Sequence, residues 1–374
     1  MKGYVRKRGK TWSYTVDIGR DPVTNKRKQK TKSGFKTKKE AEKALTEVNY
    51  EIEKGIWLEP SDITFNEIAE KWFSTHKRNL KETTAESYEN LLNKHIYPYF
   101  KNVKIQNLKP IHGQSFVDKL LENLKPTSVE KILLLVKMTL DYAVNLEIIF
   151  KSPFKKISMP RKKTNKDKRT WTFEELNRFN KVAKETDVFY HNLFAFAGFT
   201  GMRKSEILGI KRMDIDFKNA KLSVKQSVEE TKEHGLRLSR LKTPSAYRIV
   251  ALDAHCISIL KNQIDRNNEY KDLFEERYND YGLIFCKENG DLIRPTNVNK
   301  KFRQLIKLAK VPYIRIHDLR HTHATLLMEL NTNPKIVADR LGHASVQVTL
   351  DTYSHSSLSM QSNVVELFAK KINS

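Results

Sequence analysis

The first fifty residues carry a strand pattern followed by a helix pattern. Aromatic and aliphatic residues occupy every second position from 12 to 18, which places them on one face of a predicted strand. Turn-forming residues flank this stretch on both sides. Thr37 and Glu40 then form a predicted capping box, and apolar residues recur at helical spacing behind it. Residues 1–55 are therefore expected to form a small α+β module, a three-stranded sheet plus one helix.

The next ninety residues show helical periodicity throughout. A connector around Pro60 precedes a second predicted capping box, formed by Thr64 and Glu67. Because the apolar positions repeat at three- and four-residue spacing, we interpret them as the core of an all-α domain over residues 64–152. Further helices are predicted to begin near Thr84, His112 and Thr127, and the last of these is expected to be the longest.

A basic stretch separates this domain from the rest of the chain. Residues 153–169 read as a linker, because like-charge clusters are usually extended and solvated. Thr172 with Glu175 then opens the largest domain, residues 170–374. It is predicted to be mainly α with a small antiparallel sheet, since only residues 221–227, 237–241 and 247–251 look like strands. Apolar residues near the end, from Val364 to Ile372, are expected to dock on a neighbouring subunit or on their own domain.

The charge of the chain indicates a polyanionic partner. Its 374 residues hold 69 Lys and Arg against 44 Asp and Glu, a formal net charge of +25. Nucleic acid fits this balance better than a membrane surface, because no strongly basic amphipathic anchor is evident. The alternative for the basic N-terminus is a solvated tail, but disordered tails rarely carry alternating aromatic residues. Residues expected to contact DNA are Arg6, Arg8, Lys10, Lys28, Lys30, Arg161 and Lys162.

Several classes of protein are excluded by what the sequence lacks. No apolar run approaches the ~18 residues of a membrane span, and the N-terminus has no hydrophobic signal-peptide region. Cys256 and Cys286 are too few for a disulfide framework or a cysteine-based zinc site. No phosphate-binding glycine loop or dinucleotide fingerprint is present, so ATP and NAD chemistry are not supported. We expect a soluble protein of a reducing, cytoplasmic compartment.

Four short stretches of the last domain carry candidate chemistry. In the first, Gly201 allows a sharp turn into a helix at about Met202, which places Arg203 in the first turn and Glu206 on the same face. In the second, residues 243–245 are expected to form a hairpin turn with Lys242 near its tip. Taken alone, an exposed Arg–Glu pair and a solvated lysine would be ordinary surface features.

The other two stretches are rich in histidine. His317 and Arg320 are three residues apart and share one face of a predicted helix. With His321 and His323 they invite a metal interpretation, but the usual zinc-ligand order and partners are absent. Gly342 is expected to end a helix at Leu341 and to place His343 at its edge, with Tyr353 ten residues later.

This set of side chains suits phosphodiester chemistry. Attack on a phosphodiester adds negative charge to the non-bridging oxygens, and guanidinium groups can donate to two oxygens at once. Arg203 and Arg320 fit that role, and the two histidines add donors. With enough donors, no metal is required and the protein supplies the nucleophile. Tyr353 is the candidate nucleophile, His317 a candidate base, and Lys242 the candidate acid for the leaving sugar oxygen.

The four stretches resemble the tyrosine recombinase (phage integrase) family. The family set of Arg, Lys, His, Arg, His and Tyr corresponds in chain order to Arg203, Lys242, His317, Arg320, His343 and Tyr353. Glu206 matches the family's acidic residue one turn after the first Arg. Lys232 lies in the same presumed hairpin region and remains an alternative to Lys242. His323 stands where members often have an apolar residue, which we interpret as local variation.

The resemblance implies a three-domain integrase of a phage or other mobile element. Residues 1–55 would bind arm-site DNA, residues 64–152 the core site, and residues 170–374 would be catalytic. Tyr353 would form a 3′-phosphotyrosine without any cofactor, and strand exchange would pass through a Holliday junction in a DNA-bound homotetramer on attachment sites. An accessory excision factor and a host DNA-bending protein are the further partners implied. The alternatives are a type IB topoisomerase-like enzyme and a non-catalytic DNA-binding protein.

Overall fold

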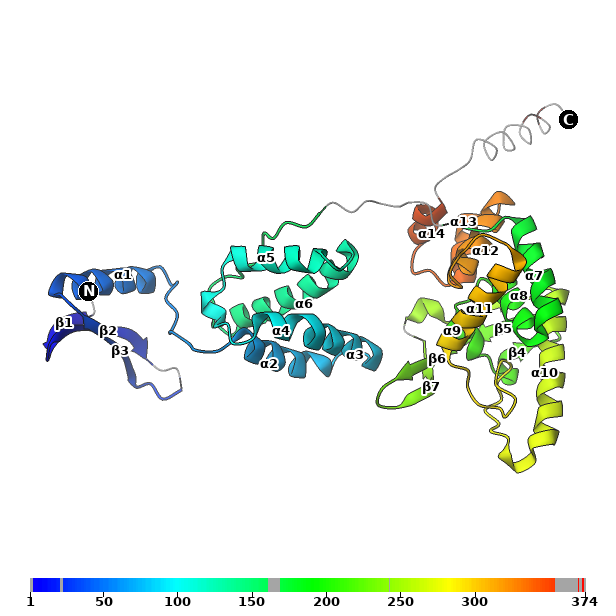
Figure 1. Ribbon diagram of the computed structural model, residues 1–374, viewed down its shortest axis with the longest axis horizontal. Coiled ribbons are helices and arrows are strands. Elements are labelled where there is room, and N and C mark those ends of the chain that lie inside the picture. The colour runs from blue at the N-terminus through cyan, green and yellow to red at the C-terminus, as the bar shows by residue number, and fades with distance from the viewer. Residues whose placement is uncertain are drawn as a thin grey trace. The chain divides into compact units, whose positions relative to one another are not determined.

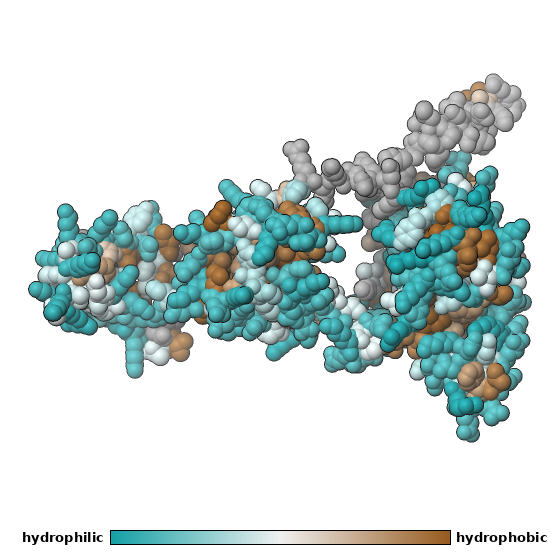
Figure 2. Space-filling view, viewed as in Figure 1, coloured by the Kyte–Doolittle hydropathy of each residue, from teal (hydrophilic) through white to brown (hydrophobic). Residues whose placement is uncertain are grey.

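The structure is a computed structural model, and it describes residues 3–20, 23–160, 169–241 and 243–353 with single positions 369 and 372. The chain divides into two compact units, residues 1–163 and 164–374, which we describe separately (Figure 1). The face in Figure 2 is dominated by hydrophilic side chains. Among the described residues, no helix is both long enough and apolar enough to cross a bilayer.

The N-terminal part of the first unit is a sheet covered by one helix. Strands β1 (Gly3–Arg8), β2 (Thr11–Arg20) and β3 (Arg27–Phe35) pair antiparallel in that order. Helix α1 (Lys38–Glu53) starts at the predicted capping box of Thr37 and Glu40 and packs on the sheet. Tyr14, Val16 and Leu45 form its small buried core, so the alternation along β2 is confirmed.

The remainder of the first unit is all-α, as predicted. Phe65, Phe100 and Phe116 are fully buried in its core, and the capping box of Thr64 and Glu67 is present. Its helices are α2 (Phe65–Lys77), α3 (Glu82–Leu91), α4 (Tyr97–Phe100), α5 (Pro110–Leu121) and α6 (Pro126–Asn145). A single π-helical turn, Leu92–Ile96, joins α3 to α4.

All three predicted helix starts in this domain lie one or two residues too late, and α5 begins at Pro110 rather than His112. Helix α3 begins at Glu82 rather than Thr84, and α6 begins at Pro126 rather than Thr127. Proline suits the first position of a helix, because it has no N–H to leave unpaired, so Pro126 and not a Thr127 cap sets the start. Helix α6, with 20 residues, is the longest of the helices described in this domain, as predicted, and α10 (Ala254–Phe274) of the second unit has 21.

The second unit is a helical body built around aromatic side chains. Trp171, Phe179 and Phe302 are buried and in ring contact, and the Trp171 indole donates to the Pro312 carbonyl at 2.8 Å. The capping box of Thr172 and Glu175 is confirmed. The other helices are α7 (Phe173–Thr186), α8 (Val188–Thr200), α9 (Lys204–Leu208), α11 (Pro295–Ala309), α12 (Asp318–Glu329), α13 (Pro334–Leu341) and α14 (Val346–Tyr353).

Two small antiparallel sheets replace the single sheet that was predicted. Strands β4 (Ile215–Asp216), β5 (Lys221–Val224) and β8 (Arg248–Ala251) form one sheet, and β6 (Gln226–Thr231) pairs with β7 (Gly235–Arg240) in the other. The hairpin turn therefore lies at residues 232–234, and not at 243–245. Because β8 pairs with β5 instead of β7, Pro244–Ala246 form a 3₁₀ turn that leads from one sheet to the other.

Candidate active site

Arg203 is held at the start of a helix by a glycine turn. Helix α8 ends at Gly201, whose backbone is left-handed with φ of 62°. A Cβ atom there would lie 2.6 Å from side-chain carbons of both His323 and Leu341, so only glycine fits. Arg203 is the N-cap of α9, which begins at Lys204 and not at Met202 as predicted. Its side chain is 37% exposed and is thus accessible to a ligand.

Glu206 anchors this arginine from inside the protein. Its side chain is 2% exposed, and Oε1 accepts a 2.7 Å hydrogen bond from Arg203 Nη1 while Oε2 accepts one of 2.8 Å from Arg248 Nη2. Burial favours the neutral acid, but the bonds and charges of Arg248 and Arg203 hold the pKa of Glu206 below its ordinary value. The pair is therefore a buried ionic contact rather than the surface pair that spacing alone indicated.

Arg248, which the sequence did not single out, connects three segments of the site. Its guanidinium is 6% exposed and binds Glu206, behind Arg203. Nε donates to the Arg340 carbonyl at 2.8 Å, at the end of α13, and Nη1 donates to the Ala246 carbonyl at 3.0 Å. The signal available in the sequence was a charged residue within a strand that is otherwise apolar, since buried charges require partners.

Arg320 is buried between the two glycine turns. It is 3% exposed on α12, where Nη1 donates to the Gly201 carbonyl at 3.1 Å and Nη2 to the Leu341 carbonyl at 2.5 Å. Arg203 Nη2 approaches the Gly342 carbonyl of the same turn at 3.5 Å. The two arginines, 117 positions apart in sequence, are therefore brought to one place, because they bind the neighbouring carbonyls of Leu341 and Gly342.

His343 lies beside these arginines. Gly342 ends α13 in a left-handed conformation, with φ of 69°, and His343 follows directly, as predicted. Its Nδ1 is 2.8 Å from the Thr349 hydroxyl of α14. Burial, followed by the positive charges of Arg320 and Arg203, lowers the pKa of His343 to about 4. The imidazole is therefore neutral at pH 7 and can donate or accept a hydrogen bond.

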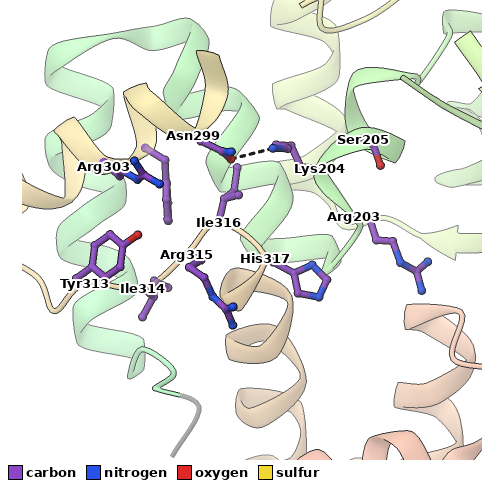
Figure 3. A pocket seen from close by; sticks show the side chains of 11 residues that line it. Arg203, Lys204, Ser205, Asn299, Arg303, Tyr313, Ile314, Arg315, Ile316 and His317 are labelled. Atoms are coloured by element: carbon purple, nitrogen blue, oxygen red, sulfur yellow. Dashed lines mark hydrogen bonds between the residues drawn. The ribbon is translucent and has the colours of Figure 1, made fainter. Parts of the chain in front are cut away.

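His317 lies at the mouth of a cavity next to Arg203 (Figure 3). It is the N-cap of α12, one turn before Arg320, so it precedes the helix that was predicted to carry both residues. Desolvation, followed by the charges of Arg320 and Arg203, lowers the pKa of His317 as well. A neutral imidazole there is able to accept a proton.

His323 is a structural residue rather than a local variation without consequence. Its Nδ1 lies 2.9 Å from the Gly198 carbonyl, and its Nε2 accepts a 3.1 Å hydrogen bond from Arg340 Nε. Both ring nitrogens are thus occupied, which removes His323 from the hypothetical zinc cluster with His317 and His321. Burial and the Arg340 charge lower its pKa to about 4.

This histidine is expected to make the stability of the second unit depend on pH. Its folded pKa of about 4 lies below the ordinary 6.5, so the unfolded chain binds a proton first as the pH falls. Stability is therefore complete above pH 6.5 and declines toward pH 4, by about 2 kcal/mol at pH 5 for this one group. His323→Gln keeps a donor and an acceptor without the titration, and should remove that share of the decline.

Hydrogen exchange of α8 amides in the full chain, at pH 8 and pH 5, measures the effect. His255→Gln provides the control, because His255 is an exposed histidine of the same unit. This variant should keep the wild-type dependence on pH. A His323→Gln protein that loses as much protection as the wild type at pH 5 would contradict the assignment.

Two predicted catalytic side chains lie outside the described part of the structure. Lys242 itself is not described, but Leu241 before it and Ala246 after it are both buried. A Cβ on Gly342 would lie 2.9 Å from the Ser245 carbonyl, so the turn that follows Lys242 contacts the turn that precedes His343. Tyr353 is the last residue of α14, one helical turn after Thr349.

The predicted DNA-binding residues of the N-terminal module are either exposed, as on β1 and in the turn after it, or paired with Glu59. Arg6 and Arg8 alternate with Val5 on β1, and since Val5 packs toward α1, the arginines lie on the opposite face of the sheet. Lys10 lies exposed in the following turn. Lys28 and Lys30 are paired with Glu59 at 3.1 and 2.9 Å. Arg161 and Lys162 lie outside the described residues.

Comparison with known proteins identifies the family of the chain. Residues 169–360 match the phage integrase family, residues 64–121 a phage integrase N-terminal SAM-like domain, and residues 4–52 an arm DNA-binding domain. A tyrosine recombinase XerC-like protein of Caldanaerobacter subterraneus subsp. tengcongensis is 31% identical to the chain, with 97% of each sequence covered.

Solved structures share the fold. The Tn1549 transposon integrase in complex with a circular intermediate DNA has a TM-score of 0.70 at 19% identity, covering 82% of this chain and 99% of the other. A lambda integrase tetramer bound to a Holliday junction has a TM-score of 0.60 at 16% identity, covering 96% and 97%. With a family match over the catalytic unit and a relative aligned along nearly the whole chain, the protein belongs to the phage integrase family of tyrosine recombinases.

Proposed function

We propose that the chain is the site-specific recombinase of a phage or integrative element, and that it cuts and rejoins double-stranded DNA at attachment sites. The observation that carries the proposal is the convergence of Arg203, Arg320 and His343 on the turns at residues 201–203 and 341–343. The fixed charges of the two arginines, together with a hydrogen-bond donor on His343, stabilise the charge that develops on a phosphate under attack.

The two arginines differ in what they can do. Arg203 is partly exposed and fixed from behind by Glu206, so its fork can bind the non-bridging oxygens directly. Arg320 is buried and donates to two backbone carbonyls. It therefore contributes mainly through its positive charge. Removal of one preorganised donor of this kind typically costs about 3–4 kcal/mol of barrier stabilisation.

The proposed covalent step gives each catalytic side chain one role. The Tyr353 oxygen attacks the scissile phosphorus, and the bond from phosphorus to the 5′ oxygen breaks. His317, neutral at pH 7, accepts the phenolic proton, and Lys242 gives a proton to the departing 5′ oxygen. The product is a 3′-phosphotyrosine with a free 5′-hydroxyl. A partner strand's 5′-hydroxyl reverses the attack, so the bond energy is conserved and no cofactor is consumed.

Lys242 is favoured over Lys232 as the acid. The turn after Lys242 contacts Gly342 and is bonded by Arg248, which also binds Glu206. Lys232 lies instead at the far turn of the β6–β7 hairpin, between Thr231 and Gly235. The segment that carries Lys242 is therefore tied to the same arginine as Arg203.

DNA binding is expected to extend beyond the catalytic unit. The net charge of +25 and the exposed Arg6, Arg8 and Lys10 support contact of the arm module with phosphates. Lys28 and Lys30 contribute once Glu59 releases them, and Arg161 and Lys162 are proposed to follow the backbone between domains. A homotetramer on DNA is supported by the shared fold with the lambda integrase tetramer. An accessory excision factor and a host DNA-bending protein complete the proposed partners, at the bacterial nucleoid.

A two-duplex assay tests this proposal against its alternatives. Two labelled duplexes with candidate attachment sites should yield recombinant products and a four-way Holliday junction intermediate. A type IB topoisomerase-like enzyme would relax supercoiled plasmid without exchanging strands between duplexes. A non-catalytic DNA-binding protein would shift both duplexes in a gel without covalent product. Either of these two results would overturn the proposal.

A further inference from the structure

A cavity of about 400 Å³ opens beside the catalytic cluster, on α11 and the segment that leads into α12 (Figure 3). It shares Arg203 and His317 with the site described above. Figure 3 shows Arg203 at one side of the view and Arg303 with Tyr313 at the other. The cavity is therefore continuous with the position proposed for the scissile phosphate.

The lining combines an apolar floor with a positive rim. Phe302 and Ile314 are 1% and 2% exposed, and they form a floor together with Ile316. The rim carries positive and polar groups without any carboxylate: Arg203, Lys204, Arg303, Arg315, His317, Asn299, Ser205 and Tyr313. Such a lining suits a ligand that has both an anionic group and an apolar part.

Two of the rim cations are already bound within the protein. Lys204 Nζ donates to the Pro295 carbonyl and to Asn299 Oδ1, both at 2.8 Å. Arg315 forms a two-pronged pair with Asp318, with Nε and Nη2 at 3.0 and 2.8 Å from its oxygens. These contacts shape the walls of the cavity.

Arg303 is the rim cation that remains available. Its side chain is exposed on α11, and within the described part of the chain it makes no hydrogen bond or ion pair. Tyr313, 57% exposed on the same rim, offers a hydroxyl and a ring face. A guanidinium and a phenol that face an apolar floor are suited to a phosphate with its attached sugar and base.

We propose that this cavity holds a DNA nucleotide that flanks the scissile phosphate, with its phosphate on Arg303 and its sugar and base over the floor of Phe302 and Ile314. The inference rests on the proposed function, because Arg203 must hold the scissile phosphate for a flanking nucleotide to arrive here. A strand held at Arg203 would run along the cavity toward Arg303, since both side chains line it. Arg303 is thus a positioning residue that sets the register of the strand.

Neutral phosphate analogues test this contact. A nicked suicide duplex is prepared with a methylphosphonate, which carries no charge, at each phosphate flanking the cleavage site in turn. With the wild-type protein, one of these substitutions should slow covalent adduct formation about tenfold, the effect of one charged hydrogen bond. Arg303→Ala should slow cleavage of the unmodified duplex by a similar factor. The same methylphosphonate should then have no further effect on this variant.

Lys300→Ala is the matched control, because Lys300 is exposed one turn earlier on α11 and does not line the cavity. This variant should remain sensitive to the methylphosphonate. If Arg303→Ala cleaves as fast as the wild type, or remains sensitive at every flanking position, the inference is wrong. Failure of the wild-type chain to form any adduct on the unmodified duplex would instead count against the proposed function.

Discussion

Replacing Tyr353 with phenylalanine is expected to abolish the covalent protein–DNA adduct while leaving DNA affinity within about twofold of the wild type. The phenyl ring has no oxygen to bond to phosphorus, so the chemical step is lost altogether. Affinity persists because it depends on the positive surface and not on one phenol. Denaturing gels with a nicked suicide duplex measure the adduct, and gel shifts at fixed salt measure binding.

Tyr281→Phe is the appropriate control, since Tyr281 is an exposed tyrosine of the same unit. It should form the adduct at the wild-type rate. An adduct that persists in Tyr353→Phe would move the nucleophile to another residue. Loss of binding and adduct together would show that the substitution acts on folding or assembly instead of chemistry.

Arg248→Met is expected to destabilise the second unit by about 3–5 kcal/mol and to suppress cleavage. Methionine preserves much of the side-chain volume, but of the two ion pairs that Glu206 makes it leaves only the one with Arg203. It also removes the bonds to the carbonyls of Arg340 and Ala246. Arg248 no longer connects the segments next to Arg203, His343 and Lys242. Activity should therefore fall further than the loss of stability alone explains.

Urea unfolding of the full chain, followed by hydrogen exchange in α8 and α12, measures the stability change. Arg277→Met is the matched control, because Arg277 is exposed and remote from the cluster in sequence. It should stay within about 0.5 kcal/mol of the wild type. If Arg248→Met unfolds as the wild type does and cleaves at the same rate, the buried arginine is not what holds the site together.

Local features were predicted well, because they depend on neighbouring residues alone. The three threonine–glutamate boxes at Thr37, Thr64 and Thr172 all begin helices, since their bonds form within four residues. The end of α13 at Gly342 followed from the same local reasoning. The motif spacing also identified Arg203, Arg320 and His343, which the fold brings together.

What could not be predicted are contacts between distant segments. Arg248 and Arg340 were missed because their partners, Glu206 and the Ala251 and Phe199 carbonyls, lie far away in sequence. His323 was interpreted as a variation, since nothing local indicates that Arg340 donates to it. The pairing of β8 with β5 rather than β7 is another long-range choice, and it moved the expected hairpin turn from residues 243–245 to 232–234.

The protonation state of the histidines also became clear only from their surroundings in the structure. The sequence allowed His343 to be a cation beside the arginines. Burial and the charge of Arg320 lower its pKa to about 4, so the positive charge of the site resides in guanidinium groups. Arg203, Arg320 and Arg248 supply it, and all three are held by carboxylate or carbonyl oxygens of the protein.

The central claim is that a tyrosine cuts DNA in a pocket of fixed arginines without a metal ion, and peptide mapping of the adduct tests it most directly. A nicked suicide duplex is incubated with the full chain in excess chelator, and the trapped adduct is digested with trypsin. The peptide of residues 341–370 contains Tyr353 as its one tyrosine. The account predicts a nucleotide on Tyr353 at undiminished yield. A nucleotide on any other residue, or an adduct that requires magnesium, would contradict it.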